Sequence, residues 1–178
     1  MKDARYRFSA EKAFSAIHWM VGEGQPIDLH AALKACYFAD KSHLNEHLQP
    51  IFGVTYRAMK YGPVPLEIYE MMKGEQLWLW ETQREEMPWT IQGHRLLLNG
   101  QNSEADLSCF SDSEIRHLKL GLKQSSSMNF TARTAATHGP DWKAANGGRM
   151  RYEDMLDERE NRDAVLQSMQ ETARYVKL

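Results

Sequence analysis

Apolar residues recur at helical spacing through the first fifty positions and predict two amphipathic helices. The first helix is expected to begin near Ser9, and its apolar stripe consists of Ala10, Ala13, Phe14, Ile17 and Val21. The second follows Asp28, a favourable N-cap residue, and its stripe consists of Leu29, Ala32, Leu33, Cys36 and Tyr37. Asp40, His43 and His47 continue this second stripe on the same face. Polar residues are therefore expected where the pattern otherwise predicts core.

The middle of the chain changes from helical to alternating periodicity. Residues 54–58 predict a short strand, and the paired prolines of the segment 61–65 predict a rigid extended turn. Between Leu77 and Gly100, apolar and polar positions alternate on both sides of a turn at Gln92-Gly93, which predicts a β-hairpin. The same alternation places Trp78 and Trp80 on one face of a strand.

The last third returns to helical signals. Ser111 and Glu114 have the spacing of a capping box and predict the start of a helix that continues through Leu122. A further helix is expected over residues 128–136, then a loop that carries Trp142, and finally a C-terminal helix over residues 157–176. The expected fold class is α+β: a mostly helical single domain, residues 1–178, with a small antiparallel β-sheet.

Composition narrows the classes of function. The chain carries 22 Lys and Arg against 24 Asp and Glu, a net charge of −2, so it has no basic field that would favour nucleic acid. A helix-turn-helix interpretation of residues 113–138 leaves Arg133 as the one cationic residue of its second helix, which is too few for DNA recognition. Two cysteines are too few for a disulfide framework. No signal peptide or apolar span is evident, so a cytoplasmic protein without membrane contact is expected.

The polar residues that continue the second stripe are the first candidates for chemistry. His43 and His47 lie four residues apart, a spacing at which two imidazoles can share one metal ion. Asp40 and His138 would complete the ligand set of a metal-dependent enzyme. The alternative is a buried Asp–His hydrogen bond that ties the second helix to the segment around His138. The sequence favours this structural network, and neither a metal nor another cofactor is expected.

Two tryptophans are the second candidates for a functional role. Trp78 and Trp80 would share one face of the predicted sheet, and only one face of such a sheet needs to be core. Tryptophan is enriched at binding hot spots. An exposed Trp face that contacts a protein partner is therefore one hypothesis, and tryptophans packed in the core are the other.

Three stretches together resemble a known family. They are Cys36-Tyr37-Phe38-Ala39-Asp40 with His43-Leu44, then Met59-Lys60-Tyr61-Gly62-Pro63-Val64, and finally Thr137-His138 with Trp142. In this order they resemble the Panacea domain of SocA-like antitoxins, which also occurs in phage-associated proteins. The resemblance covers about residues 10–155 and leaves the C-terminal helix as a variable tail.

The resemblance implies an antitoxin of a type II toxin–antitoxin system, which neutralises a cognate toxin by direct protein binding. One alternative is a proteolytic adaptor that delivers the toxin to a AAA+ protease. The resemblance implies no enzymatic activity, which leaves the metal-dependent enzyme as the less favoured alternative. The matched residues are expected to form a structural network: Tyr37, Asp40, His43, Lys60, Tyr61, Gly62, Pro63, His138 and Trp142. Trp78, Trp80 and the tail are the expected contact surface.

Overall fold

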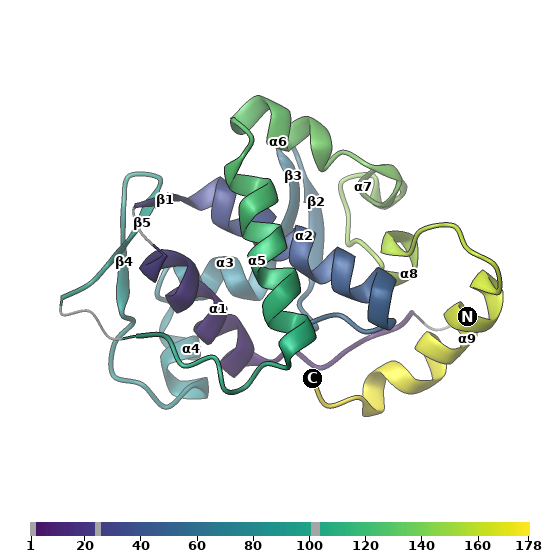
Figure 1. Ribbon diagram of the computed structural model, residues 1–178, viewed down its shortest axis with the longest axis horizontal. Coiled ribbons are helices and arrows are strands. Elements are labelled where there is room, and N and C mark those ends of the chain that lie inside the picture. Colours follow the sequence, from purple (N-terminus) through teal and green to yellow (C-terminus); the bar gives the residue numbers. More distant parts are fainter. Residues whose placement is uncertain (1–2, 24–25, 101–103) are drawn as a thin grey trace.

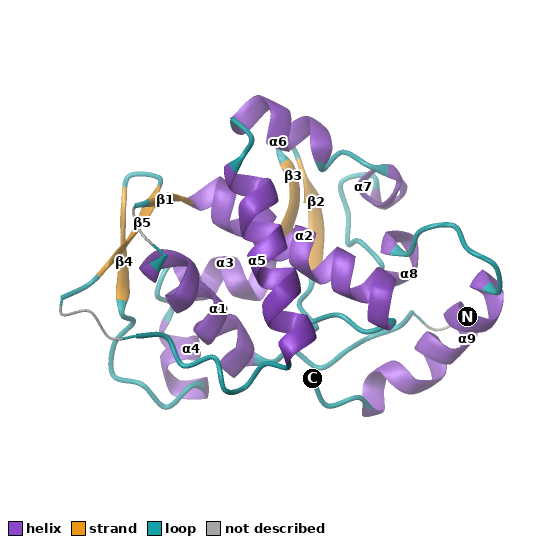
Figure 2. Ribbon diagram, in the orientation of Figure 1, coloured by secondary structure: helices purple, strands orange, loops and turns teal. Residues whose placement is uncertain are grey.

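The computed structural model describes residues 3–23, 26–100 and 104–178, and it confirms the predicted α+β class. Two small antiparallel sheets lie among helices (Figures 1 and 2). The helices are α1 (Ala10–Gly22), α2 (Leu29–His47), α3 (Leu66–Met72), α4 (Gln76–Glu81), α5 (Asp112–Ser126), α6 (Phe130–Ala136), α7 (Pro140–Ala145), α8 (Tyr152–Met155) and α9 (Arg162–Thr172), which continues as a 3₁₀ turn over Ala173–Tyr175. The strands are β1 (Ile27–Asp28), β2 (Tyr56–Met59), β3 (Gly62–Pro65), β4 (Trp89–Gln92) and β5 (Arg95–Leu98).

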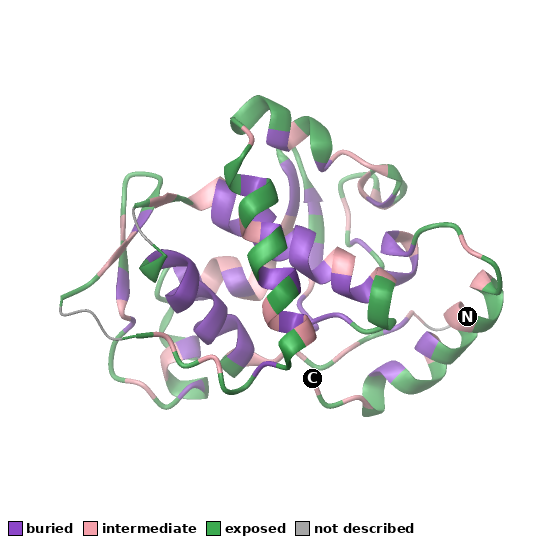
Figure 3. Ribbon diagram, in the orientation of Figure 1, coloured by how far each residue is buried: buried purple, intermediate pink, exposed green. Residues whose placement is uncertain are grey.

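Helix α2 forms the centre of the molecule, and α5 packs along it (Figure 1). Every residue of α2 from Ala31 to Asp40 is buried, so this helix is surrounded rather than amphipathic (Figure 3). At the α2–α5 contact, a Cβ added to Gly121 would lie 2.6 Å from the carbonyl oxygen of Ala35. The two backbones therefore approach as closely as they do because position 121 lacks a side chain.

Local sequence signals fix the ends of these two helices. The Asp28 carboxylate accepts a hydrogen bond from the amide of Ala31 at the start of α2, as an N-cap does. The predicted capping box opens α5, with reciprocal hydrogen bonds between Ser111 and Glu114. Both predictions are confirmed. Each depends on residues within one turn, so the sequence alone could specify it.

The two sheets lie on different sides of α2. The strand order of the larger sheet is β1-β5-β4, and β4 and β5 form the predicted hairpin with Trp89 opposite Leu98. The smaller sheet is the β2–β3 hairpin, with Met59 opposite Gly62. Strand β3 packs against α2, so the β2–β3 turn meets the N-terminal half of that helix.

The chain folds back on itself so that its first described residues meet α8. The backbone amide of Ala4 donates to Glu153 Oε1 at 2.7 Å, and both residues are buried. The ring of Tyr6 packs edge-on against Tyr152, with centroids 5.1 Å apart. Beyond α8, helix α9 buries Met169 and the following turn buries Ala173. In the described ranges no helix combines the length and apolar character needed to cross a bilayer.

Three sequence predictions about secondary structure are wrong. Residues 76–81 form helix α4 rather than a strand, and Trp142 lies in α7 rather than in a loop. The last helix spans Arg162–Thr172 and not residues 157–176. In α4 the alternating Leu and Trp residues mimic a strand, but Trp78 packs edge-on against Phe8 with centroids 5.1 Å apart. Tertiary contact therefore overrides the local alternation.

Candidate functional site

The best candidate site lies where the β2–β3 turn meets α2 and α6. Gly62 opens β3 with φ +101°, a conformation that side chains rarely adopt. A Cβ at this position would lie 2.4 Å from Thr137 Oγ1 and 2.9 Å from Lys34 Cε. Glycine is therefore required both by the backbone conformation and by the close approach of α2 and the end of α6. The same contact brings two of the matched sequence stretches together.

Lys34 lies beneath this turn and is fully buried. Its Nζ donates to the carbonyl oxygen of Pro63 at 2.7 Å. Burial and, to a lesser extent, the nearby charge of Arg133 together lower the pKa of Lys34 to about 7. The amine therefore changes charge near neutral pH instead of remaining an ammonium throughout.

Arg133 fastens α6 to the rest of the site. Its Nε and Nη2 donate to the carbonyl oxygens of Ser125 and Met128 at 2.9 and 2.6 Å. Its Nη1 lies 3.1 Å from His30 Nδ1, which must accept because a guanidinium only donates. His30 is then the Nε2–H tautomer, and Nε2 donates to the carbonyl oxygen of Tyr61 at 3.1 Å. One imidazole thus connects α6, α2 and the β2–β3 turn.

These elements enclose an apolar pocket of about 530 Å³. Three large hydrophobic side chains near it are substantially exposed: Met59 at 44%, Tyr61 at 48% and Phe130 at 47%. Tyr61 packs edge-on against Phe130 with centroids 5.1 Å apart. The remaining lining residues are Asp28, Leu29, His30, Leu33, Lys34, Lys60, Gly62, Val64, Tyr69 and His94. Lys34 is fully buried and changes charge near neutral pH, so Lys60 and Asp28 are the lysine and aspartate that a ligand at this lining would meet. The pocket therefore suits an apolar group.

The Asp40 carboxylate forms a separate, closed centre farther along α2. It accepts hydrogen bonds from the amides of Ile51 and Phe52 and from the hydroxyl of Tyr56, at 2.5, 3.1 and 3.0 Å. The Tyr152 hydroxyl lies 3.3 Å away. Burial raises the pKa of Asp40 to about 6 even though these hydrogen bonds favour the charged form. The residue holds the loop after α2 in place and has no open side.

The predicted hydrogen bond between Asp40 and a histidine is wrong. His43 Nδ1 donates instead to the carbonyl oxygen of Gln49 at 2.7 Å, and burial lowers the pKa of His43. His138 stacks on the indole of Trp142, with centroids 3.8 Å apart. The donors to Asp40 come from loop backbone and from tyrosines, which a pattern of side-chain types does not reveal.

The other matched residues make separate contacts, and those of Tyr37 and Trp142 hold α7 against the core. Tyr37 donates to Asp141 Oδ2 at 2.5 Å, and Lys41 Nζ lies 3.1 Å from the same oxygen. Trp142 Nε1 donates to the carbonyl oxygen of Met59 at 2.9 Å. Lys60 extends over the Tyr61 ring, 5.1 Å from its centroid. The single network expected from sequence is therefore several local ones.

The metal set expected as an alternative, Asp40, His43, His47 and His138, is not assembled. In the described part of the chain, the one group of three or more His, Cys, Asp or Glu side chains close enough to share a cation contains His47 but none of the other three. The two cysteines do not form a disulfide: Cys36 and Cys109 are both free, the first buried and the second exposed.

The two tryptophans proposed as a contact surface have different environments. Trp78 is buried, and its Nε1 donates to Glu70 at 3.1 Å. Trp80 is 70% exposed on α4. Since only one of the pair reaches the surface, the expected two-tryptophan face does not exist.

Three residues of the apolar pocket gave no functional signal in the sequence: His30, Lys34 and Phe130. Lys34 adjoins the apolar stripe of α2 and reads as an ordinary solvent-facing lysine of an amphipathic helix. The signal that could have revealed it is the dense alanine and leucine content on both sides of it, which is typical of a helix buried all round.

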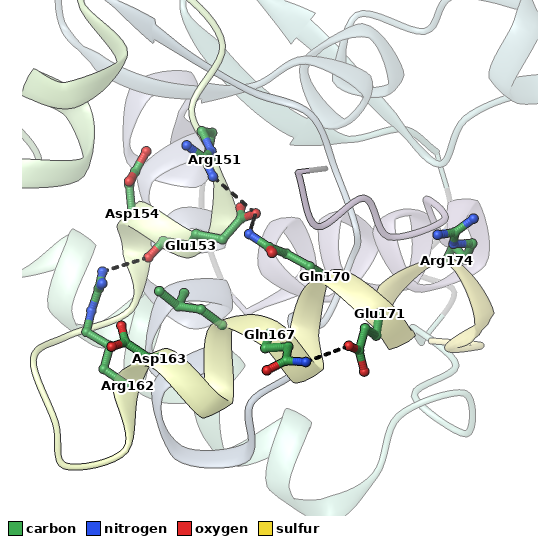
Figure 4. A pocket seen from close by; sticks show the side chains of 10 residues that line it. Arg151, Glu153, Asp154, Arg162, Asp163, Gln167, Gln170, Glu171 and Arg174 are labelled. Atoms are coloured by element: carbon green, nitrogen blue, oxygen red, sulfur yellow. Dashed lines mark hydrogen bonds and ion pairs between the residues drawn. The ribbon is translucent and has the colours of Figure 1, made fainter. Parts of the chain in front are cut away.

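A second pocket, of about 750 Å³, lies between α8 and α9 (Figure 4). Figure 4 shows Arg151 and Gln170 pointing toward the Glu153 carboxylate, and each reaches its Oε1 at 3.4 Å. Gln167 pairs with Glu171 at 2.9 Å within α9. Charged groups of both signs fill this lining and pair with one another. The pocket is therefore the polar attachment of the tail and a weaker candidate than the apolar one.

Comparison with known proteins gives one finding. The family model described as "Antitoxin SocA-like, Panacea domain" matches residues 33–143, which is more than half of the chain. The matched range includes Lys34, the β2–β3 hairpin, α6 and Trp142, and it ends before α8 and α9. No curated protein and no solved structure matches the chain.

Proposed function

The chain belongs to the family of SocA-like antitoxins with a Panacea domain, and from this premise we propose that it neutralises a cognate toxin by binding it directly. The partner is a protein, and the protein described here acts by binding and not as an enzyme. The toxin–antitoxin pair would be of type II, in which both components are proteins.

One observation carries the proposal: the matched residues surround an apolar pocket whose rim is exposed. Met59, Tyr61 and Phe130 come from two distant stretches of sequence and are each more than 40% exposed. Clustered exposed hydrophobic side chains around a pocket are typical of a protein-binding surface. Their supports, Gly62, Lys34 and Arg133, are buried, so the surface is rigid before a partner arrives.

The lining also defines what the toxin would present. An aromatic or aliphatic side chain would enter the pocket, and a neighbouring carboxylate would meet Lys60. The proposed contact is therefore the β2–β3 turn and α6, in place of the Trp78 and Trp80 surface expected from sequence.

The test begins with co-expression of the protein and the product of the adjacent gene. Phe130→Ala should weaken the purified complex by about 30-fold or more, the effect of truncating a binding hot spot. Leu120→Ala is the matched control, because Leu120 is 51% exposed on α5 away from the pocket; it should change affinity by less than about threefold. Trp80→Ala tests the alternative surface. A loss with Trp80→Ala and none with Phe130→Ala would contradict the pocket, and a harmless neighbour that forms no complex would contradict the antitoxin.

Delivery of the toxin to a AAA+ protease is the alternative mechanism, and it would use the same contact. Toxin half-life separates the two in a pulse-chase experiment. Masking predicts slower toxin turnover when this protein is present, and the adaptor predicts faster turnover. Phe130→Ala should abolish either change, whereas Leu120→Ala should leave it intact.

A further inference from the structure

Four ring or carboxylate side chains gather where the C-terminal end of α2 meets α5, away from the apolar pocket. Glu46 and His47 end α2, and His117 reaches them from α5. His117 Nε2 lies 3.0 Å from Glu46 Oε2, and His47 Nε2 lies 3.5 Å from Glu46 Oε1. The His43 ring packs beside them, with centroids 4.6 Å from His47 and 5.2 Å from His117.

A hydrogen bond with Ser42 orients the His117 ring. The Ser42 hydroxyl donates to the carbonyl oxygen of Ala39 at 3.1 Å, and a hydroxyl has only one hydrogen to give. With the Ser42 hydrogen on Ala39, Ser42 Oγ can accept from His117 Nδ1, which lies 2.7 Å away. In that tautomer Nδ1 carries the proton and Nε2 is available to bind a cation.

His117 Nε2 has unusual surroundings for a buried atom. The His117 side chain is 3% exposed, and Nε2 has no hydrogen-bond partner in the described part of the chain. Glu46 Oε2 lies 3.0 Å away and forms an ion pair with the ring when the imidazole is protonated. When the ring is neutral and protonated at Nδ1, this buried nitrogen is left to bind a cation.

We propose that Glu46, His47 and His117 bind a divalent transition-metal ion, with zinc as the metal that best suits the ligands. One ligand atom from each residue lies within 4.8 Å of the other two. Two ligands of a tetrahedral zinc ion with bonds near 2.1 Å are separated by about 3.4 Å, close to the 3.0 and 3.5 Å between Glu46 and the two histidines. Two imidazoles and one carboxylate are ligands that zinc accepts.

The surroundings favour a site with one position open to water. Glu46 and His117 also line a shallow pocket of about 550 Å³ beside Tyr37, so solvent reaches the fourth position. Arg116 holds Glu46 Oε1 at 2.6 Å and its other nitrogen lies 3.3 Å from Oε2. Arg116 thus orients the carboxylate and holds Oε2, the oxygen beside His117 Nε2, less closely than Oε1. The bound ion would link α2 to α5.

A cobalt titration of the tag-free full chain tests the site. Four-coordinate Co²⁺ absorbs strongly in the visible range, and the absorption should saturate at one equivalent and disappear when zinc is added. His47→Ala should weaken binding by about 100-fold or more, since it removes a ligand. Ser42→Ala should weaken it by about 10- to 100-fold, because it frees the His117 ring. His94→Ala removes an exposed histidine that lines the apolar pocket and is not part of this cluster, so it should leave the cobalt absorption unchanged.

Thermal unfolding gives a second readout that does not depend on the toxin. Zinc should raise the melting temperature of the unmodified protein and leave that of His47→Ala unchanged. His47 is partly exposed, so its replacement does not threaten the fold as loss of buried His117 would. Absence of one-equivalent binding, or equal losses in His47→Ala and His94→Ala, would overturn the site. Toxin binding by Phe130 variants is unaffected by either result, so this inference and the proposed function fail separately.

Discussion

Helix α2 buries two opposite charges six residues apart, and they have very different surroundings. Asp40 accepts hydrogen bonds from two backbone amides and a tyrosine hydroxyl and is enclosed on all sides. Lys34 donates to the Pro63 carbonyl and lies against an open pocket. The pKa of each shifts toward the neutral form, to about 6 for Asp40 and about 7 for Lys34, with burial as the largest cause.

The difference separates a charge that is closed on all sides from one that borders a cavity. The Asp40 carboxylate accepts hydrogen bonds from the loop after α2 and holds that loop in place. The Lys34 amine holds the β2–β3 turn through Pro63, and Lys34 also lines the apolar pocket. Burial alone therefore does not distinguish the two residues; the cavity beside Lys34 does.

Removal of the Asp40 carboxylate should have the largest effect on stability. Asp40→Ala leaves the amides of Ile51 and Phe52 and the hydroxyl of Tyr56 without acceptors, and each buried orphan costs about 1–3 kcal/mol. We expect the free energy of unfolding to fall by about 5 kcal/mol in urea denaturation. Asp40→Asn keeps one acceptor oxygen and should cost about 1 kcal/mol. Equal losses in the two variants would contradict a role based on hydrogen bonds.

The pH dependence of the free energy of unfolding should distinguish Lys34 from Asp40. Between about pH 7 and 10.5 the unfolded chain keeps a proton that folded Lys34 releases, so stability should rise with pH. Between about pH 4 and 6 folded Asp40 keeps a proton that the unfolded chain releases, so its contribution should fall as pH rises. Lys34→Met should remove the alkaline rise, which is on the order of 5 kcal/mol at about 1.4 kcal/mol per pKa unit. Parallel curves for the two proteins above pH 7 would refute the shifted amine.

Gly62→Ala should have a smaller effect and test the turn above Lys34. The added methyl group meets Thr137 and Lys34 and forces a side chain into positive φ. We expect a loss of about 3 kcal/mol, the sum of backbone strain and overpacking. Gly74→Ala is the matched control, because its φ is +75° but a Cβ there meets nothing within 4 Å; it should cost about 1–2 kcal/mol. Equal losses at 62 and 74 would show that contact with α2 does not matter.

Sequence reasoning succeeded where the determining residues lie within one turn of each other. The N-cap at Asp28, the capping box of α5 and the β4–β5 hairpin were all predicted, and the polar position at Asp40 was recognised as exceptional. The partners of Asp40 were not predictable, because two of them are backbone amides of a loop.

The candidate site was predicted only in part, and for a physical reason. Pro63 stood out because proline fixes the backbone and Gly62 because glycine permits conformations closed to other residues, whereas Lys60 and Tyr61 stood out as part of the stretch that resembles the family. Lys34 and Phe130 join them only after α2 and α6 pack together, and Trp78 turned inward because of Phe8. Nothing within a few residues of these positions specifies such contacts.

The hydrogen bond from Ala4 to Glu153 closes a loop of 149 residues and has a consequence for synthesis on the ribosome. Ala4 is synthesised long before Glu153, so its final contact must wait until α8 has emerged. Tyr152, next to Glu153, also completes the surroundings of Asp40 at that moment. These groups should therefore remain accessible to chaperones and proteases in the nascent polypeptide until residue 153 has been made.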